Sequence, residues 1–322
     1  MRAASIVSLD GPMAVEYGEV PDPVMDPSQV LIEVHAAGIT FPDVLMTRGR
    51  YQMKPDLPFV PGLQVAGIVR RAPEASGFSE GDRVCAFTFL GGFCELVVAD
   101  PTQVFALPDT MSWSTGAAAL VNYLTAHFVL LKRGHVVAGE TVLIHGAGGG
   151  LGLATIQLAK ALGARVLAVV STPEKAAAAR RSGADETLPV EGFLEAAREV
   201  TGGLGVNLVI DPVGGDRFTD SLRCLATSGS LIVVGFAAGE IPTVRVNRLL
   251  LKNISVIGAA WGAHAMTTPG YAQSQWAELT ELFTAGTLNP EISVLLPLAE
   301  ASEGLRQLEE REAVGNVVLQ VR

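Results

Sequence analysis

Apolar residues in the first part of the chain come in short runs separated by proline, glycine and polar residues. This pattern predicts a strand at 29–36 and two more at 65–69 and 83–87, with a turn at 79–82 between the last two. Strands at this spacing are typical of a β-barrel rather than of βαβ units. The pattern therefore predicts a compact β-barrel-like domain that ends near residue 121.

The pattern changes near Asn122, where strands of the apolar kind that is buried on both faces alternate with helical stretches. The predicted strands lie at 142–145, 166–170, 208–210, 231–234 and 255–258, and the predicted helices at 174–182, 193–201 and 218–225. Strands and helices in this alternation indicate an α/β domain built on a doubly wound parallel sheet.

The last part of the chain is too short for a domain of its own. Its pattern predicts helices at 274–285 and 299–312 and strands at 295–298 and 317–321. We expect this tail to return to the first domain, so that the α/β domain is an insertion. The expected domains are 1–121 with 260–322, and 122–259.

A glycine cluster follows the first predicted parallel strand and opens a predicted helix. After His145 and Gly146 come Ala147, Gly148, Gly149, Gly150, Leu151 and Gly152. The spacing Ala147-x-Gly149-x-x-Gly152 is that of a dinucleotide-binding turn with alanine in the first glycine position. Glycines allow a tight turn and a close approach of the backbone to a pyrophosphate, whose charge the helix N-terminus favours. A strand before the glycines and a helix after them distinguish this motif from a flexible loop.

The tip of the second parallel strand favours NADPH over NADH. An acidic residue there would accept hydrogen bonds from the adenosine ribose, but this strand ends in Ser171 and Thr172, followed by Lys175. Two hydroxyls and an ammonium suit a 2′-phosphate. Glu174 begins a helix and can point away to cap it. The alternative for Lys175 is an ordinary solvated lysine.

Composition limits the classes of partner. Of 322 residues, 49% are hydrophobic and 17% charged, and the formal net charge of −10 disfavours nucleic acid and anionic membrane as partners. No apolar signal-peptide core follows Met1, and no uninterrupted apolar stretch is expected to span a bilayer, so we expect a cytoplasmic protein. Cys85, Cys94 and Cys224 form no CxxC pair and are expected to be packed thiols.

Several motifs together resemble the zinc-free, zeta-crystallin-like quinone oxidoreductases of the medium-chain dehydrogenase/reductase superfamily. They are, in chain order, residues 37–43, 48–51, 58–62, 81–84 and 122–126, the glycine cluster, 171–175 and 211–215. The resemblance covers nearly the whole chain. It implies a GroES-like β-barrel catalytic domain around an inserted Rossmann domain, and a homodimer.

The same resemblance bears on metal binding. Zinc-dependent members place a cysteine where this chain has Thr40 and a His-Glu pair where it has Leu63 and Gln64, and they carry a lobe of four cysteines that is absent here. Threonine and leucine do not ligate zinc, so we expect no metal. Two further departures are Thr40 in place of the asparagine of the quinone reductases, and Val190 in place of a tyrosine that packs on the adenosine phosphate.

Catalysis without zinc requires another group to stabilise the charge that develops on the substrate oxygen after hydride transfer. Tyr51 and Thr40 are the candidate hydroxyls. Asp43 is expected to orient substrate or water, or only to cap a short helix. For Tyr51 the alternative is an aromatic side chain packed on a loop.

The expected cofactor-binding residues extend beyond the glycine cluster and the strand tip. Thr125 resembles a position near the nicotinamide ribose, with a hydrogen bond to its own helix backbone as the alternative. Gly235, Phe236 and Asn316 complete the expected set. His145 is expected to be a strand-end histidine whose hydrogen bonds are satisfied.

Three functions remain open from the sequence. The first is an NADPH:quinone reductase, the second an enone or 2-enoyl thioester reductase, and the third a non-catalytic NADPH-binding protein. Arg48, Arg50 and Lys54 would suit the phosphates of coenzyme A and so favour the second. The strand at 255–258 is expected to lie at the edge of the parallel sheet and to form a homodimer contact, with Ile254, Val256 and 245–250 nearby.

Overall fold

The computed structural model describes all residues, 1–322, and separates into two compact units. One unit contains Met1–Val121 and Pro269–Arg322, and we call it the discontinuous unit; the other, Asn122–Thr268, is the inserted unit. The inserted unit extends to Thr268 rather than ending at residue 259. The reason is helix α8 (Trp261–Thr267), whose His264 ring stacks on Phe128 of the same unit with ring centroids 5.1 Å apart.

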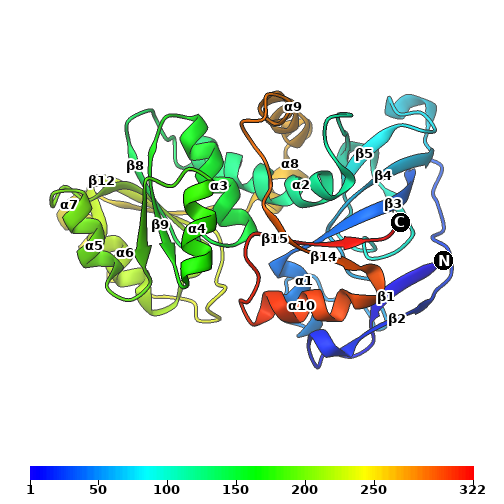
Figure 1. Ribbon diagram of the computed structural model, residues 1–322, viewed down its shortest axis with the longest axis horizontal. Coiled ribbons are helices and arrows are strands. Elements are labelled where there is room, and N and C mark those ends of the chain that lie inside the picture. Colours follow the sequence, from blue (N-terminus) through cyan, green and yellow to red (C-terminus); the bar gives the residue numbers. More distant parts are fainter. The chain divides into compact units, whose positions relative to one another are not determined.

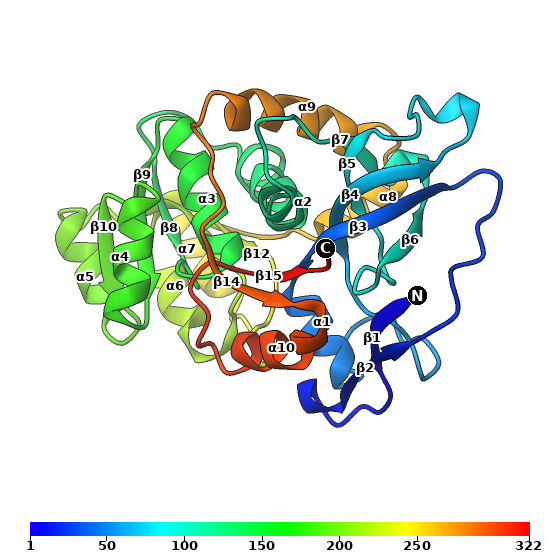
Figure 2. The ribbon, with the colours of Figure 1, turned by 45° about the vertical axis from the view of Figure 1, so that its right-hand side comes forward.

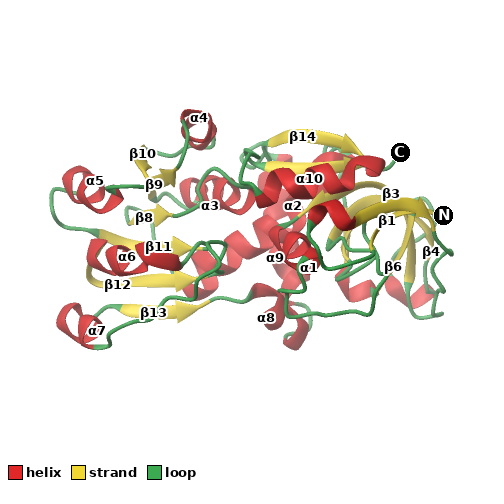
Figure 3. Cartoon of the chain, turned by 90° about the horizontal axis from the view of Figure 1, so that it is seen from below, coloured by secondary structure: helices red, strands yellow, loops and turns green.

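The inserted unit is a doubly wound parallel sheet, as the sequence predicts. Its six strands run in the order β10-β9-β8-β11-β12-β13, and every neighbouring pair is parallel. The strands are β8 (Thr141–Ile144), β9 (Arg165–Val170), β10 (Glu186–Pro189), β11 (Val206–Asp211), β12 (Leu225–Val233) and β13 (Ser255–Gly258). The sequence pattern did not predict β10. Figure 3 shows the strands side by side with helices around them.

Helices cover this sheet and follow its strands in turn (Figure 1). They are α3 (Gly150–Ala161), α4 (Pro173–Arg181), α5 (Phe193–Val200), the short η5 (Gly215–Arg217), α6 (Phe218–Cys224), α7 (Asn247–Lys252) and α8. The sheet core is apolar and closed to solvent: Leu143, Leu167, Val209 and Leu231 are at most 1% exposed. Parallel strands buried on both faces are expected to be this uniformly apolar.

The discontinuous unit is built around a mixed sheet in the order β14-β15-β3-β4-β5-β7, in which β14 and β15 are parallel and the other neighbouring pairs are antiparallel. Its strands are β1 (Arg2–Ile6), β2 (Val15–Glu19), β3 (Val30–Ile39), β4 (Gln64–Arg71), β5 (Arg83–Phe87), β6 (Leu96–Ala99), β7 (Val104–Ala106), β14 (Ile292–Pro297) and β15 (Asn316–Gln320). Strand β3 pairs with β4 along one edge, and its other edge is shared by β6 and β15. The C-terminal tail therefore adds β14 and β15 to the sheet of the first 121 residues, and β1 and β2 form a separate ribbon.

The discontinuous unit also contains three α-helices and four short helical turns, which lie between its strands. They are α1 (Phe41–Thr47), α9 (Tyr271–Thr284), α10 (Ala301–Glu309) and the short turns η1 (Pro12–Ala14), η2 (Glu74–Ser76), η3 (Pro101–Gln103) and η6 (Leu298–Glu300). Helix α10 contacts both α1 and η1 (Figure 2). The boundary between the units falls inside α2 (Trp113–His127).

Helix α2 continues into a π-helix, η4 (Phe128–Arg133), and the combined segment is unusually apolar. At 21 residues and a mean hydropathy of 1.3 it is long and apolar enough to cross a membrane by length and composition alone. It is not an uninterrupted apolar stretch of the kind that the sequence was predicted to lack, because Asn122, Thr125 and His127 lie inside it. In this structure 67% of its most apolar part is buried, which accounts for the apolar character.

Candidate cofactor and substrate sites

The glycine cluster connects β8 to α3 and forms the tight turn expected of it. Gly146 adopts a left-handed conformation (φ 60°), and Gly149 is the N-cap of α3 with no side chain over the helix end. A Cβ on Gly152 would lie 2.6 Å from the Cα of Ala147, so only glycine lets the helix pack this closely on the turn. The first-turn N–H groups of a helix have no helical acceptor, and here no side chain caps them. They remain available to an anion.

Lys175 lies across the glycine cluster. A Cβ on Gly148 would be 2.6 Å from both Cβ and Cγ of Lys175, so the aliphatic stem of the lysine covers this glycine. The contact joins the turn after β8 to the first turn of α4, which follows the neighbouring strand β9. Two of the sequence-predicted cofactor elements are thus in direct contact.

The tip of β9 is polar and exposed. Ser171 and Thr172 are both exposed, and Thr172 is the N-cap of α4, where its hydroxyl accepts a hydrogen bond from the backbone N–H of Lys175 at 3.3 Å. Hydrogen bonding from its own backbone N–H and from Thr172 holds the pKa of the Glu174 carboxyl below its usual value.

A cavity of about 240 Å³ opens beside this strand tip. It is lined by residues 170–173, Ala176 and 187–189, which come from the carboxyl ends of β9 and β10 and the start of α4. Ligands of open α/β sheets bind beyond the carboxyl ends of the strands. Val190, which stands where the related reductases have a tyrosine, is half-buried and packs on the core of the unit.

Two buried polar residues support the loops at this edge of the sheet. His145 donates to the Ser221 hydroxyl at 2.8 Å, since that hydroxyl itself donates to the Arg217 carbonyl. Burial, and then the charge of Arg217, lowers the pKa of His145 to about 3, so the ring stays neutral. Its Nδ1 has no partner, so only half of its hydrogen-bonding capacity is used. Asp211, buried at the end of β11, accepts hydrogen bonds from the backbone N–H groups of Val213 and Gly214, both at 2.9 Å.

Three other predicted cofactor residues occupy this unit. Thr125 is half-exposed on α2, and its hydroxyl makes no hydrogen bond within the protein, so the alternative of a hydroxyl bond to its own helix backbone is not observed. Gly235 and Phe236 follow β12, and Gly235 approaches the carbonyl of Pro212 so closely that a Cβ would lie 3.3 Å from it. The Phe236 side chain is 39% exposed.

The discontinuous unit holds the remaining predicted residues, and there Thr40 and Asp43 are bound to each other. Thr40 ends β3 and is the N-cap of α1, and both its N–H and its hydroxyl donate to Asp43 Oδ2, at 2.8 and 2.6 Å. Asp43 Oδ1 accepts from the Gly62 N–H at 3.0 Å. Burial raises the pKa of Asp43 to about 6, against the effect of these three donors. The side chain of Asp43 is fully buried, so it caps α1 and anchors the loop before β4.

Tyr51 is the one predicted catalytic group whose hydroxyl makes no hydrogen bond within the protein. It lies half-buried in the loop after α1. Burial, and then the charge of Asp43, raises the pKa of Tyr51, which keeps the phenol protonated. The Thr40 hydroxyl, by contrast, already donates its proton to Asp43. A protonated hydroxyl that donates to no other group can donate a hydrogen bond to a developing oxyanion.

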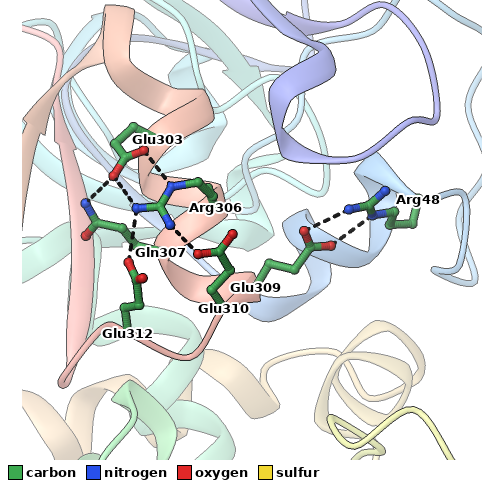
Figure 4. Close-up of polar contacts among 7 residues, drawn as sticks. All are labelled: Arg48, Glu303, Arg306, Gln307, Glu309, Glu310 and Glu312. Atoms are coloured by element: carbon green, nitrogen blue, oxygen red, sulfur yellow. Dashed lines mark hydrogen bonds and ion pairs between the residues drawn. The ribbon is translucent and has the colours of Figure 1, made fainter.

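Arg48 is occupied by structural contacts. Its Nε and Nη2 form a paired salt bridge with Glu309 of α10, each at 2.9 Å (Figure 4). Its Nη1 donates to the Asp10 carbonyl. A second cluster, on α10 and the turn that follows it, gathers Glu303, Glu310 and Glu312 around Arg306. Of the three basic residues predicted to suit coenzyme A, only Arg50 and Lys54 are exposed with no side-chain hydrogen bond to the protein.

Asn316, the last predicted cofactor residue, begins β15. Its backbone N–H and its Nδ2 both donate to the Glu291 carbonyl, at 2.8 and 2.9 Å, and the side chain is 6% exposed. These bonds tie β15 to the segment before β14. Asn316 belongs to the discontinuous unit, as do Thr40, Asp43 and Tyr51.

The potential metal ligands are dispersed. No three histidine, cysteine, aspartate or glutamate residues come together as a metal site would require. Cys85, Cys94 and Cys224 are buried free thiols, and burial raises the pKa of all three, for Cys94 and Cys224 to about 12. At such values the thiolate form needed for metal binding is scarce near neutral pH.

Comparison with known proteins identifies the family. The alcohol dehydrogenase GroES-like domain matches residues 26–143, and the zinc-binding dehydrogenase domain matches residues 150–285. The quinone oxidoreductase-like protein 2 homolog of Nematostella vectensis is 36% identical over 327 residues, which cover 100% of this chain and 89% of that protein. The chain belongs to the quinone oxidoreductase branch of the medium-chain dehydrogenase/reductase superfamily.

Solved structures of this family agree with the fold over the whole chain. A probable oxidoreductase from Mycobacterium abscessus has a TM-score of 0.92 at 42% identity, with 100% of this chain and 99% of the other covered. The Escherichia coli quinone oxidoreductase complexed with NADPH has a TM-score of 0.92 at 28% identity, with both chains covered completely. The predicted fold class, a GroES-like domain with an inserted Rossmann domain, is confirmed.

Proposed function

We propose that this oxidoreductase is an NADPH:quinone reductase that works without a metal ion. The observation that carries the proposal is the contact of Lys175 with Gly148, which lays the stem of a cationic side chain against the turn before an uncapped helix N-terminus. NADPH carries anionic groups that match both features, a pyrophosphate and a 2′-phosphate. The E. coli relative complexed with NADPH is a quinone oxidoreductase, which supports the same cofactor and substrate class here.

The residues of the inserted unit fit this cofactor. The backbone of residues 147–152 would hold the pyrophosphate, since a side chain at Gly148 or Gly152 would collide with its neighbours. Ser171 and Lys175 would receive the 2′-phosphate. Thr125, Gly235 and Phe236 of the same unit are proposed to line the rest of the cofactor site. Bound NADPH supplies a hydride to the substrate.

Tyr51 is the proposed donor to the substrate oxygen. Its phenol is protonated and free of internal hydrogen bonds, whereas the Thr40 hydroxyl donates to Asp43. Asp43 positions Thr40 and the Gly62 loop and, being fully buried, does not itself reach a substrate. The proposed catalytic set is therefore Tyr51, with Thr40 and Asp43 in a supporting role.

Zinc independence is proposed from the side chains at the ligand positions of the metal-dependent relatives. Leu63 is buried and apolar, and the Oε1 of Gln64 accepts a hydrogen bond from the Val121 N–H at 2.9 Å. The Thr40 hydroxyl donates its hydrogen bond to Asp43. None of these three offers the thiolate, imidazole or carboxylate that zinc prefers.

The alternative of an enoyl thioester reductase rests on cations for the phosphates of coenzyme A. Arg48 is no longer a candidate, because its guanidinium is shared by Glu309 and the Asp10 carbonyl. Arg50 and Lys54 alone make a weaker anion site than the three residues considered together. We therefore rank quinones ahead of enoyl thioesters, and both ahead of a non-catalytic role.

The deciding experiment measures NADPH oxidation by the purified protein against a panel of quinones, simple enones and 2-enoyl coenzyme A esters, with and without a chelator. We expect turnover with quinones at a rate that the chelator does not change. Faster turnover with enoyl coenzyme A esters would support the alternative function. Tight NADPH binding without turnover on any acceptor would support the non-catalytic role.

A homodimer formed through the inserted unit is also proposed. Strand β13 pairs only with β12 and so lies at the edge of its sheet. The adjoining α7 exposes Leu250 and Leu251 to 75% and 79%, which is unusual for leucine. Val256 is half-buried, but Ile254 is 6% exposed and packs in its own core, so its predicted place at the interface is not supported.

A cytoplasmic location without nucleic-acid or membrane partners remains a proposal. It is supported by the net charge of −10, which disfavours polyanionic partners. Fractionation of cells that produce the protein, with detection in the soluble and membrane fractions, tests it.

A further inference from the structure

The loop that begins with Tyr51 makes no hydrogen bond of its own. Neither the backbone nor the side chains of residues 51–58 form a hydrogen bond within the protein. The last backbone bond before this loop runs from the Arg50 N–H to the Leu45 carbonyl of α1, at 2.9 Å. The turn formed by residues 48–50 is therefore the nearest hydrogen-bonded support of the Tyr51 side chain.

Arg48 ties that turn to two other parts of the discontinuous unit. Its Nε and Nη2 each donate to Glu309 of α10 at 2.9 Å (Figure 4), and its Nη1 donates to the Asp10 carbonyl at 2.6 Å. Two parallel bonds to one carboxylate fix the direction of the guanidinium as well as its distance. The guanidinium lies against Gly11, where a Cβ would come 2.2 Å from its Cζ. Arg48 thus links α1 to α10 and to the start of η1, three elements that contact one another.

Glu309 is the replaceable half of this arrangement, since the Asp10 contact uses a backbone carbonyl. The hydrogen bond from Arg48 lowers the pKa of Glu309, so the carboxyl is ionised near neutral pH. The side chains of Arg48 and Glu309 are 38% and 29% exposed, so water screens the pair and it contributes little to the stability of the whole unit. Its effect on geometry matters more, because a displacement of about 1 Å at a catalytic group costs on the order of a hundredfold in rate.

We propose that Glu309 is a positioning residue that holds Arg48 and, through it, the turn that presents the Tyr51 hydroxyl to the substrate. The proposal rests on the proposed function, in which Tyr51 donates to the developing negative charge on the substrate oxygen. The neighbouring cluster around Arg306 holds no loop of this kind, because all its members lie on α10 and the turn that follows it.

The test measures NADPH oxidation by purified full-length variants with the acceptor that the wild type turns over fastest. Glu309→Gln removes the charge and keeps the length of the side chain, and Arg48→Lys keeps the charge but loses the paired donors. Both should lower kcat about three- to tenfold, less than Tyr51→Phe does, because a loosened turn still reaches the productive position part of the time. The KM for NADPH should stay within about twofold.

A double variant, Glu309→Gln with Tyr51→Phe, separates positioning from a general structural effect. Without the hydroxyl there is no donor to misplace, so Glu309→Gln should lower kcat no further in the Tyr51→Phe protein. If the loss of Glu309 only loosens the unit, the two reductions in kcat should multiply. That result would overturn the inference.

Hydrogen exchange in the protein without cofactor gives a readout that does not depend on activity. The amides of residues 48–50 donate to carbonyls in the last turn of α1 at 3.2, 3.0 and 2.9 Å, so their exchange reports how firmly the turn is held. They should exchange faster in Glu309→Gln than in the wild type. Unchanged exchange would show that the turn does not depend on Glu309, against the inference.

The matched control is Glu310→Gln, which removes the same charge from the adjacent residue. Glu310 pairs with Arg306 and not with Arg48 (Figure 4). The control should keep the wild-type kcat and exchange rates, and a fall in kcat equal to that of Glu309→Gln would overturn the inference. A fall for Tyr51→Phe without one for Glu309→Gln contradicts only the role of Glu309. No fall for Tyr51→Phe contradicts the proposed donor and the inference together, as does a lack of turnover with every acceptor.

Discussion

At the scale of single residues, hydrogen bonding decides which of the predicted groups are available for chemistry. Thr40, Asp43 and Tyr51 were chosen from the sequence as polar groups in motifs near the reaction centre. In the structure Thr40 and Asp43 use their donors and acceptors on each other and on Gly62, whereas Tyr51 makes no internal hydrogen bond. The residue type shows which hydrogen bonds a side chain can make, and its partners in the folded protein decide which of them are still available to a substrate.

Replacing Tyr51 tests its proposed role as the donor. Tyr51→Phe removes one hydroxyl and keeps the ring, so kcat with a quinone should fall about ten- to a hundredfold. The Kd for NADPH should not change. Tyr17→Phe, which removes an exposed hydroxyl from β2 of the same unit, serves as the control and should keep full activity. An unchanged kcat for Tyr51→Phe would mean that water or a backbone N–H supplies the donor.

The buried carboxyl of Asp43 predicts a pH dependence of stability. Its pKa is about 6 in the folded protein, against an ordinary value of 3.8 for a solvated aspartate, so the folded state binds this proton more tightly. The contribution to stability is therefore fully present below pH 3.8 and is lost as the pH rises through about 6. We expect a loss of about 3 kcal/mol from this group, at 1.36 kcal/mol per unit of pKa.

Asp43→Asn isolates that contribution. Denaturant unfolding of both proteins between pH 4 and pH 7 gives the difference in their free energies of unfolding. The wild type should lose stability relative to the variant as the pH rises through this range. A difference that is constant with pH would show that Asp43 is ionised throughout, held by its three donors.

At the scale of elements, the strand, glycine turn and helix of the inserted unit are the most predictable part of the chain. The predicted strand at 142–145 overlaps β8, and the helix opens at Gly150, inside the predicted glycine cluster. Apolar runs and glycines mark these elements because both faces of the sheet are buried and the turn excludes side chains.

Strand β10 was missed for a physical reason. It is four residues long, begins with Glu186 and ends with Pro189, and only Leu188 is buried in it. An edge strand of this kind lacks the apolar run that marks a central strand, and proline is tolerated where an N–H faces no partner.

The close packing of α3 on its turn gives a prediction for the element. Gly152→Ala would place a Cβ 2.6 Å from the Cα of Ala147, and backbone cannot give way as a flexible side chain does. We expect about 1–3 kcal/mol of destabilisation and weaker NADPH binding. Gly149→Ala is the matched control, because its Cβ would meet nothing closer than 3.6 Å and its φ of −92° suits alanine. Thermal unfolding compares them, and equal losses of stability would contradict the packing argument. NADPH titration is applied to Gly152→Ala alone, because Gly149 itself belongs to the proposed pyrophosphate turn.

At the scale of the whole molecule, the chain is one fold inserted into another. The sequence pattern predicts this arrangement because a tail of two strands is too short to fold alone, and in the structure β15 pairs with β3 across most of the chain length. The end of the insertion was harder to locate. Helix α8 is only seven residues long, and its attachment to the inserted unit depends on a ring contact between His264 and Phe128.

The proposed homodimer is the prediction that belongs to this scale. An open edge at β13 exposes unpaired backbone groups, and a two-fold axis beside it would pair two such edges in one continuous sheet. The exposed Leu250 and Leu251 of α7 would be buried in the same contact. Light scattering at micromolar concentration should therefore give about twice the chain mass of 33.6 kDa.

The double variant Leu250→Glu with Leu251→Glu should give the mass of one chain, because four like charges would face each other across the axis. Leu204→Glu, an 82% exposed leucine elsewhere in the inserted unit, should leave the dimer intact. A wild-type protein of single mass would mean that this edge stays unpaired and that its apolar surface has another use.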